Sequence, residues 1–222
     1  MRVLAIFALA ASAAWCANDP RLVDAAKAGR QAEVESLLKA GASPDSTSAD
    51  GTTALHWAVN RNDFAMTDKL LASGAQPSLV TRYSVVPLTL AAENGNAAMI
   101  ERLLKAGASP DSVSEEGQTA LMTASRNGNL DAVRVLLRSG AKVNLAENFR
   151  GQTALMFAAG EGNTAAAELL IEFGAGLQAK SKAGFTPLLF AVRNNHIDTV
   201  KFLLSKGANA NDVTQDGTPA LS

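Results

Sequence analysis

The sequence repeats about every 33 residues, and this period constrains the fold more than any other feature. An apolar pair, Leu-Leu or Leu-Ile, followed by Gly-Ala recurs six times, with glycines at Gly41, Gly74, Gly107, Gly140, Gly174 and Gly207. The intervals are 33, 33, 33, 34 and 33 residues, and the single extra residue falls around residues 148–150, where a loop can absorb it. A second motif, Gly51-Thr52-Thr53-Ala54-Leu55, recurs in the same register at Ser84, Gly117, Gly151 and Gly184. Two motifs in one register indicate a solenoid of stacked units.

Each unit is predicted to contain two short helices and a loop. The Thr of the opening motif is a helix N-cap, because its hydroxyl accepts from backbone N–H groups that lack a partner within the helix. The first helix ends at a residue suited to the left-handed conformation: Asn62, Gly95, Gly128, Gly162 or Asn195. A second helix, with apolar residues at i, i+3 and i+4, ends at the Gly-Ala pair. The polar stretch up to the next opening is expected to form an extended finger.

This pattern resembles the ankyrin repeat family, whose units have a Gly-x-Thr-Pro-Leu-His opening, an Ala-Ala core and a Leu-Leu-x-x-Gly-Ala close. The resemblance covers about residues 18–222. It implies an all-α solenoid of paired antiparallel helices with β-hairpin-like finger loops. Residues 18–49 resemble an N-terminal capping repeat, and residues 217–222 start a sixth, truncated repeat. Five full repeats are expected within residues 50–216, starting near Asp50, Tyr83, Glu116, Arg150 and Ala183.

Two departures from the family pattern lead to structural expectations. The tetrapeptide ends in His only at His56, and the other four repeats have Thr89, Met122, Met156 and Leu189. Hydrogen bonds that this His makes between repeats in the family are expected to be lost in those four, which leaves apolar stacking to hold them. In the second repeat Ser84 replaces the opening Gly and Val86 replaces the capping Thr, so its finger is expected to be the least regular.

The first 17 residues have the layout of a secretory signal peptide: Arg2, an apolar run over residues 3–14, and then small residues. The run is too short to cross a bilayer comfortably, so no membrane span is expected. Cleavage after this segment predicts a secreted or periplasmic protein. Two alternatives stay open, an apolar N-terminal helix of the fold and lipidation of Cys16 in the manner of bacterial lipoproteins, for which Trp15 is bulky.

The sequence offers little for catalysis or metal binding. One Cys cannot form an internal disulfide framework or a Cys-rich zinc site. His56 and His196 are about four repeats apart, so they cannot share a metal site, and both stand where ankyrin repeats use His structurally. No nucleophile and base pair and no phosphate-binding glycine motif is found, and the Glu115-Glu116 pair is expected at a solvated finger tip. We therefore predict a non-enzymatic protein that uses no metal and no cofactor.

The resemblance also implies where a partner binds: on finger tips, at the residue after the opening Gly, and at the two residues after the Ala-Ala pair. These positions lie on the concave face of an ankyrin solenoid. In this sequence they are Asp50, Thr52, Asn60, Arg61, Arg82, Tyr83, Val85, Glu93, Asn94, Glu115, Glu116, Gln118, Arg126, Asn127, Phe149, Arg150, Gln152, Glu161, Lys182, Phe185, Arg193 and Asn194.

The chemistry of these positions favours a protein partner. Tyr83, Phe149 and Phe185 share the face with five Arg, and both residue types are enriched in protein interfaces. Four Glu interrupt the Arg series and the net charge is −1, so a nucleic-acid partner is not expected. Bracing of a neighbouring finger is the alternative role for Tyr83 and Phe149. The rings that directly follow the tetrapeptide are predicted to form a stacked ladder between repeats rather than a ligand slot: Trp57, Phe157 and Phe190.

The leading hypothesis is a non-enzymatic ankyrin-repeat protein that binds a protein partner through its concave face and fingers, in the periplasm or outside the cell. The alternative is a regulatory or targeting repeat segment of a larger secreted enzyme, because no polar cap is visible after Leu203-Leu204. If the chain is not such a fragment, end-to-end contact at the uncapped last repeat is expected. An effector that acts inside another cell uses the same scaffold and is not distinguished at this stage.

Overall fold

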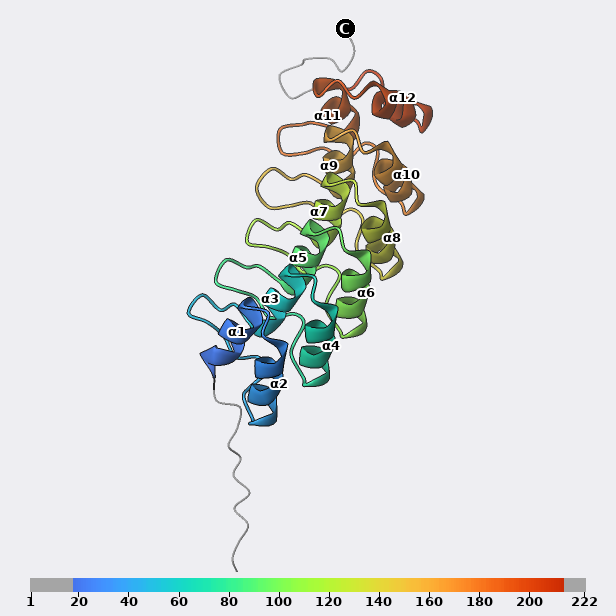
Figure 1. The fold of residues 1–222 in the computed structure, drawn as a ribbon. Coiled ribbons are helices and arrows are strands. Elements are labelled where there is room, and N and C mark those ends of the chain that lie inside the picture. Colours follow the sequence, from blue (N-terminus) through green and yellow to red (C-terminus); the bar gives the residue numbers. More distant parts are fainter. Residues whose placement is uncertain (1–17, 214–222) are drawn as a thin grey trace, which may run out of the picture.

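The computed structural model describes residues 18–213. The predicted signal peptide, with Cys16, and the predicted start of a sixth repeat at residues 217–222 lie outside the described residues. Helix pairs stack one after another along a single direction, and the loops between pairs all project to the same side (Figure 1). The predicted all-α repeat solenoid is confirmed.

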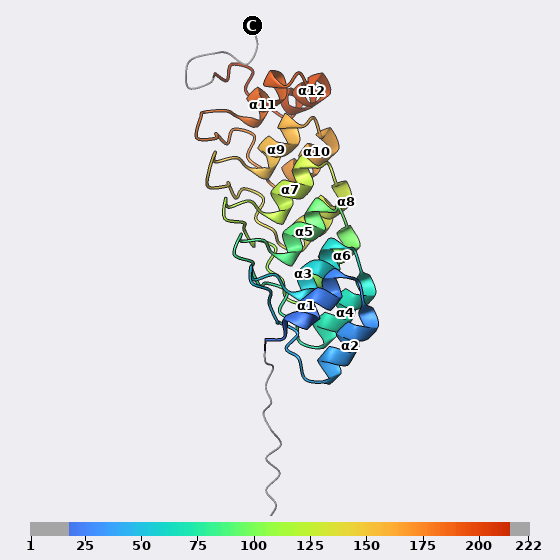
Figure 2. The same ribbon diagram turned by 60° about the vertical axis from the view of Figure 1, so that its left-hand side comes forward.

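Twelve helices occupy the described residues as six pairs joined by short turns. The first helices are α1 (Pro20–Lys27), α3 (Ala54–Asn60), α5 (Pro87–Glu93), α7 (Ala120–Arg126), α9 (Ala154–Gly160) and α11 (Pro187–Arg193). The second helices are α2 (Gln31–Lys39), α4 (Phe64–Ala72), α6 (Ala97–Lys105), α8 (Leu130–Arg138), α10 (Thr164–Glu172) and α12 (Ile197–Ser205). First helices pack against neighbouring first helices, and second helices form the other row (Figure 2). We call the pairs from α3–α4 to α11–α12 repeats 1 to 5, and the loop before each first helix fingers 1 to 5.

The helix boundaries follow from local chemistry. The hydroxyls of Thr53, Thr119, Thr153 and Thr186 accept from backbone N–H groups of the first turn, as predicted. The residues predicted to be left-handed after the first helices all have positive φ, including 73° at Gly162 and 55° at Asn62. A Cβ on Gly162 would lie 2.5 Å from His196 Nδ1, so the close approach of the next repeat also requires Gly there.

The core lies between the two helix rows. Ala residues of the first helices are fully buried and let neighbouring helices approach closely, as at Ala91, Ala124 and Ala158. Leu residues of the second helices fill the remaining space, as at Leu103 and Leu136. Burial of each such Leu contributes roughly 1.5–3 kcal/mol.

No helix within residues 18–213 is long and apolar enough to span a membrane.

Polar contacts also join repeat 3 to repeat 4 and repeat 4 to repeat 5, so the prediction that apolar stacking alone holds the repeats without the tetrapeptide His is wrong for these two junctions. The Asn163 side chain donates to the carbonyl oxygens of Ser125 and Arg126, at 3.0 and 2.7 Å, and closes the end of α7. Asn94 and Asn194 make similar bonds to the preceding first helix. Backbone N–H groups also link fingers 1 and 2, 3 and 4, and 4 and 5. The bonds of Asn163 and Asn194 join repeats whose tetrapeptide lacks His, and they satisfy helix-end carbonyls, whereas Asn94 adds to the link that His56 makes between repeats 1 and 2.

Finger 2 was expected to be the least regular finger, but this expectation is wrong for its turn, which has the same geometry as the turn of finger 5. Ser84 adopts a φ of 53°, in the left-handed region that the opening Gly occupies elsewhere. The N–H of Thr81 donates to the Val85 carbonyl, as Ser181 donates to Phe185 in finger 5. Isolated antiparallel bridges occur in fingers 1, 3 and 4, at Thr47–Thr53, Val113–Thr119 and Ala146–Thr153. What finger 2 lacks is the helix cap, because Val86 has no hydroxyl.

Candidate functional site

The fingers and the first helices together form one face of the solenoid, which we call the inner face and which corresponds to the predicted concave face. Two grooves are hollowed into it. The N-terminal groove lies between fingers 1 and 2 and is lined by Asp50, Thr52, His56, Trp57, Asn60, Thr81, Val85 and Leu90. The C-terminal groove runs over fingers 3, 4 and 5 as two hollows that share Phe149, Arg150 and Gln152.

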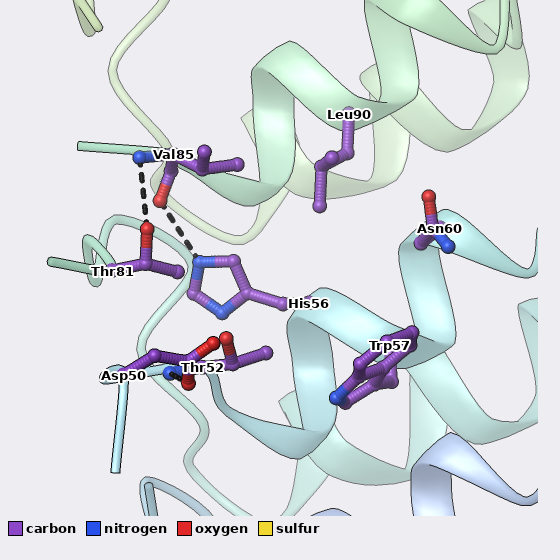
Figure 3. Close-up of a pocket in the computed structure, with 8 residues that line it drawn as sticks. All are labelled: Asp50, Thr52, His56, Trp57, Asn60, Thr81, Val85 and Leu90. Carbon is purple, nitrogen blue, oxygen red and sulfur yellow. Dashed lines mark hydrogen bonds between the residues drawn. The ribbon is translucent and has the colours of Figure 1, made fainter. Parts of the chain in front are cut away.

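His56 is the buried centre of the N-terminal groove, only 2% exposed (Figure 3). Its Nε2 lies 3.1 Å from the Val85 carbonyl oxygen of finger 2, and its Nδ1 accepts from the Thr53 N–H at 3.2 Å. Because a carbonyl can only accept, Nε2 carries the proton of the neutral ring. Burial lowers the pKa of His56, although the Val85 carbonyl and the charge of Asp50 oppose that shift. This neutral ring joins repeat 1 to repeat 2, which is the structural role predicted for it.

Asp50 provides the charge at the rim of the N-terminal groove. Its carboxylate accepts from the Ser48 hydroxyl and from the Thr52 N–H, the latter at 3.0 Å. The Ser48 hydroxyl and the Thr52 N–H lower the pKa of Asp50 to about 2. The carboxylate therefore stays charged and holds the turn of finger 1, so it has no proton to offer for acid catalysis near neutral pH.

Glu147 fixes the backbone of finger 4, which lines the C-terminal groove. Its carboxylate is 4% exposed and accepts from the N–H groups of Phe149, Arg150 and Gln152, at distances between 2.6 and 2.9 Å. Burial opposes the charged form, but these three backbone donors outweigh it, so the pKa of Glu147 lies below its ordinary value. Finger 4 is the finger with the extra residue, and Glu147 holds its enlarged turn closed.

Cations face aromatic rings along the inner face. The guanidinium carbon of Arg126 lies 5.5 Å from the Phe157 ring centre, and that of Arg193 lies 5.1 Å from both Phe185 and Phe190. In finger 4, Arg150 lies 5.9 Å from the Phe149 ring.

The predicted ladder of stacked rings is wrong, because the aromatic pair within residues 18–213 is Phe185–Phe190, with centres 5.4 Å apart. Phe157 lies instead beneath Arg126, and Trp57 beneath Lys27, each cation coming from the preceding unit. Phe190 is buried, whereas Trp57 and Phe157 are half-buried, so the three rings pack against the fold as predicted but not on one another.

All the predicted partner-binding residues are exposed or half-buried. Those that line the two grooves are Asp50, Thr52, Asn60, Val85, Glu116, Gln118, Arg126, Phe149, Arg150, Gln152, Lys182, Phe185 and Arg193. The others do not line these grooves, and two of them, Asn94 and Asn194, hold the preceding repeat. Tyr83 and Phe149 are 71% and 74% exposed, so neither ring braces a neighbouring finger.

Sequence reasoning missed Glu147, although the repeat contains a signal for it. The equivalent position is Ser48, Thr81, Ser114 or Ser181 in the other fingers. In fingers 2, 3 and 5 this hydroxyl accepts from the N–H four residues further on. The acceptor is a longer carboxylate only where the finger is one residue longer.

Within the described part of the chain, no cluster of three or more His, Cys, Asp or Glu could hold a metal ion.

Comparison with known proteins agrees with the geometry. The family model described as ankyrin repeats in three copies matches residues 22–112, 66–147 and 143–214. No curated protein matches the sequence. The matched segments cover most of the chain, and helix pairs, fingers and caps recur at the repeat interval within them. The chain belongs to the ankyrin repeat family.

Proposed function

We propose that this protein is a non-catalytic module that binds a protein partner through its inner face and fingers, in the periplasm or outside the cell. Ankyrin repeats typically mediate protein–protein interaction, and they are generally not catalytic. The proposal specifies which surface binds the partner, namely the inner face, and in which compartment the protein acts.

The observation that carries the proposal is the exposure of large side chains on the fingers. Tyr83 and Phe149 expose 71% and 74% of their surface in a chain with only 5% aromatic residues. Aromatic rings placed in this way contribute nothing to the core, whereas they are typical anchors of protein interfaces. The grooves beside them offer half-buried apolar surface together with fixed polar groups, which is the composition of a binding surface.

Capture of the partner tests this surface. The wild-type chain is compared with a variant in which Tyr83, Phe149 and Arg150 are changed to Ala, by cross-linking in periplasmic and secreted fractions. The matched control changes Phe173, Ile197 and Arg138 to Ala, because these residues are also exposed but lie on or beside the second helices. We expect the control to retain the partner and the finger variant to lose it. Equal capture by all three proteins would place the site elsewhere.

The compartment rests on the sequence of residues 1–17 and needs a separate test. We expect the protein recovered from cell fractions to lack this segment and to be found outside the cytoplasm. Mass spectrometry of its N-terminal peptide, together with fractionation, measures both. An intact N-terminus in the cytoplasmic fraction would contradict the proposed location without affecting the binding surface.

A further inference from the structure

The C-terminal groove contains more cations than the carboxylates around it can neutralise. Arg126, Arg150, Lys182 and Arg193 line it, and none of them forms an ion pair with a carboxylate of residues 18–213. Two carboxylates line the same groove, those of Glu116 and Glu147. Glu147 is buried and already accepts three backbone N–H groups, so only Glu116 faces the solvent of the groove.

Several cations of the second helices, in contrast, pair with carboxylates. On the second helices, Glu35 pairs with both Lys39 and Lys69, and Asp68 pairs with Arg102 at 3.0 Å. Other cations of the second helices, Arg134, Arg138 and Lys201, form no such pair within residues 18–213, so the groove is distinguished by the four unpaired cations that line it together. The three arginines of the groove face aromatic rings, which hold the guanidinium groups in place without neutralising their charge, whereas Lys182 Nζ donates to the Asn148 carbonyl oxygen.

The groove is also preorganised and long. Glu147 fixes the backbone of Phe149 and Arg150, so these two side chains project from a rigid turn. The lining extends from α7 across α9 to α11, which is two helix-to-helix steps of roughly 8–10 Å each. An extended chain advances about 3.3 Å per residue, so roughly five or six residues span this length.

We propose that the C-terminal groove binds an extended segment of the partner that is rich in Asp and Glu and carries at least one aromatic or large apolar side chain. Carboxylates of the segment pair with Arg126, Arg150 and Arg193, and its apolar side chain packs against Phe149 and Phe185. This inference rests on the proposed protein-binding function and specifies the chemistry of the partner. A nucleic-acid strand fits less well, because it carries a charge at every phosphate and would meet Glu116 in the groove, whereas a peptide can place an uncharged side chain there.

The test selects ligands without knowledge of the partner. The full-length chain is used to select from a displayed library of random peptides about twice the estimated length of the bound segment. Selected peptides are then synthesised, and their affinities are measured for three proteins: wild type, a groove variant and an outer-face control. The groove variant changes Arg126, Arg150 and Arg193 to Gln. The control changes Arg134, Arg138 and Lys201 to Gln, which alters net charge equally but on the second helices.

We expect the selected peptides to be enriched in Asp, Glu and aromatic residues, to bind the groove variant ~10-fold or more weakly, and to bind the control within ~2-fold of wild type. Neutral or basic selected peptides, equal weakening in both variants, or no selection at all would each overturn the inference. The inference would also be overturned if a single-stranded oligonucleotide displaced the acidic peptides and bound more tightly than they do. If the triple variant is unfolded by circular dichroism, Arg150→Gln alone, at an exposed position, serves as the groove variant.

The result is separable from that of the proposed function. One outcome is that the native partner is captured in a way that depends on Tyr83, Phe149 and Arg150 while the selected peptides are not acidic. That result would support the proposed protein-binding function and would contradict only the acidic character of the bound segment. If neither a partner is captured nor acidic peptides are selected, the proposed protein-binding function is contradicted as well.

Discussion

The N-terminal and C-terminal grooves are built on the same backbone and differ almost entirely in chemistry. In the N-terminal groove, the centre is a neutral buried His56, and the only formal charge of its lining is Asp50. In the C-terminal groove the centre is an enlarged finger held by Glu147, and four cations line the walls. The repeat fixes where side chains point, and the variable positions decide what they recognise.

The two grooves also differ in how their repeats are joined. His56 links repeats 1 and 2 through the Val85 carbonyl. In repeats 3 and 4 the corresponding Met122 and Met156 sulfurs only accept from their own N-cap N–H, at 3.5 Å, and an Asn side chain supplies the link between repeats. Between repeats 4 and 5, His196 Nε2 lies 2.9 Å from the Gly160 carbonyl oxygen, so an imidazole and the Asn194 amide share that link.

The largest effect is expected from Glu147→Ala, which removes the support of the C-terminal groove. The N–H groups of Phe149, Arg150 and Gln152 lose a charged acceptor, so the free energy of unfolding should fall by about 2–3 kcal/mol. Chemical denaturation followed by circular dichroism measures it. Glu115→Ala, at an exposed tip, is the control and should cost less than about 0.5 kcal/mol. Equal losses for the two variants would mean that Glu147 does not hold the finger.

A smaller effect is expected from His56→Met, which gives repeat 1 the residue of repeats 3 and 4. The apolar volume is largely kept, but the Val85 carbonyl loses the imidazole donor and keeps only the Thr81 N–H, so we expect a loss of about 1 kcal/mol. Met122→His should give a gain of similar size, because the Gln152 carbonyl accepts from the Glu147 N–H at 3.0 Å just as the Val85 carbonyl accepts from the Thr81 N–H, so each has one lone pair left for an imidazole donor. Thermal unfolding of both variants tests this symmetry, and a destabilised Met122→His protein would contradict it.

Val86→Thr should stabilise repeat 2 by about 1 kcal/mol, because a hydroxyl there can cap α5 as Thr53, Thr119, Thr153 and Thr186 cap their helices. The reverse change, Thr119→Val, is the matched control and should cost a similar amount. Denaturation midpoints of the two variants provide the measurement. A destabilised Val86→Thr protein would show that burial of the new hydroxyl outweighs the cap.

The sequence predicted the fold and most of the site positions because both follow from the repeat. Thr caps, left-handed Gly and Asn residues and apolar spacing are local properties, and each recurs several times in one register. It did not predict the Arg–Phe contacts or the role of Glu147, because these depend on side chains of adjacent units coming together. The absence of His from the tetrapeptides wrongly indicated apolar stacking alone for repeats 3 to 5, since the Asn163 and Asn194 amides bond to the preceding repeat.

The smallest effect is expected from the pH dependence that His56 confers on the N-terminal groove. Burial lowers the pKa of His56 in the folded state below its ordinary value, so the unfolded state binds more protons as pH falls through that ordinary value, near 6.5. The stability that His56 contributes is therefore present above about pH 6.5 and is lost as pH falls toward the folded pKa. The free-energy difference between wild type and His56→Met should shrink between about pH 7.5 and pH 5.5. Because carboxylates titrate alike in both proteins, their difference isolates the imidazole. A difference that grows on acidification would mean that the folded protein stabilises the charged ring, and the imidazolium would then offset the charge of Asp50 in the N-terminal groove.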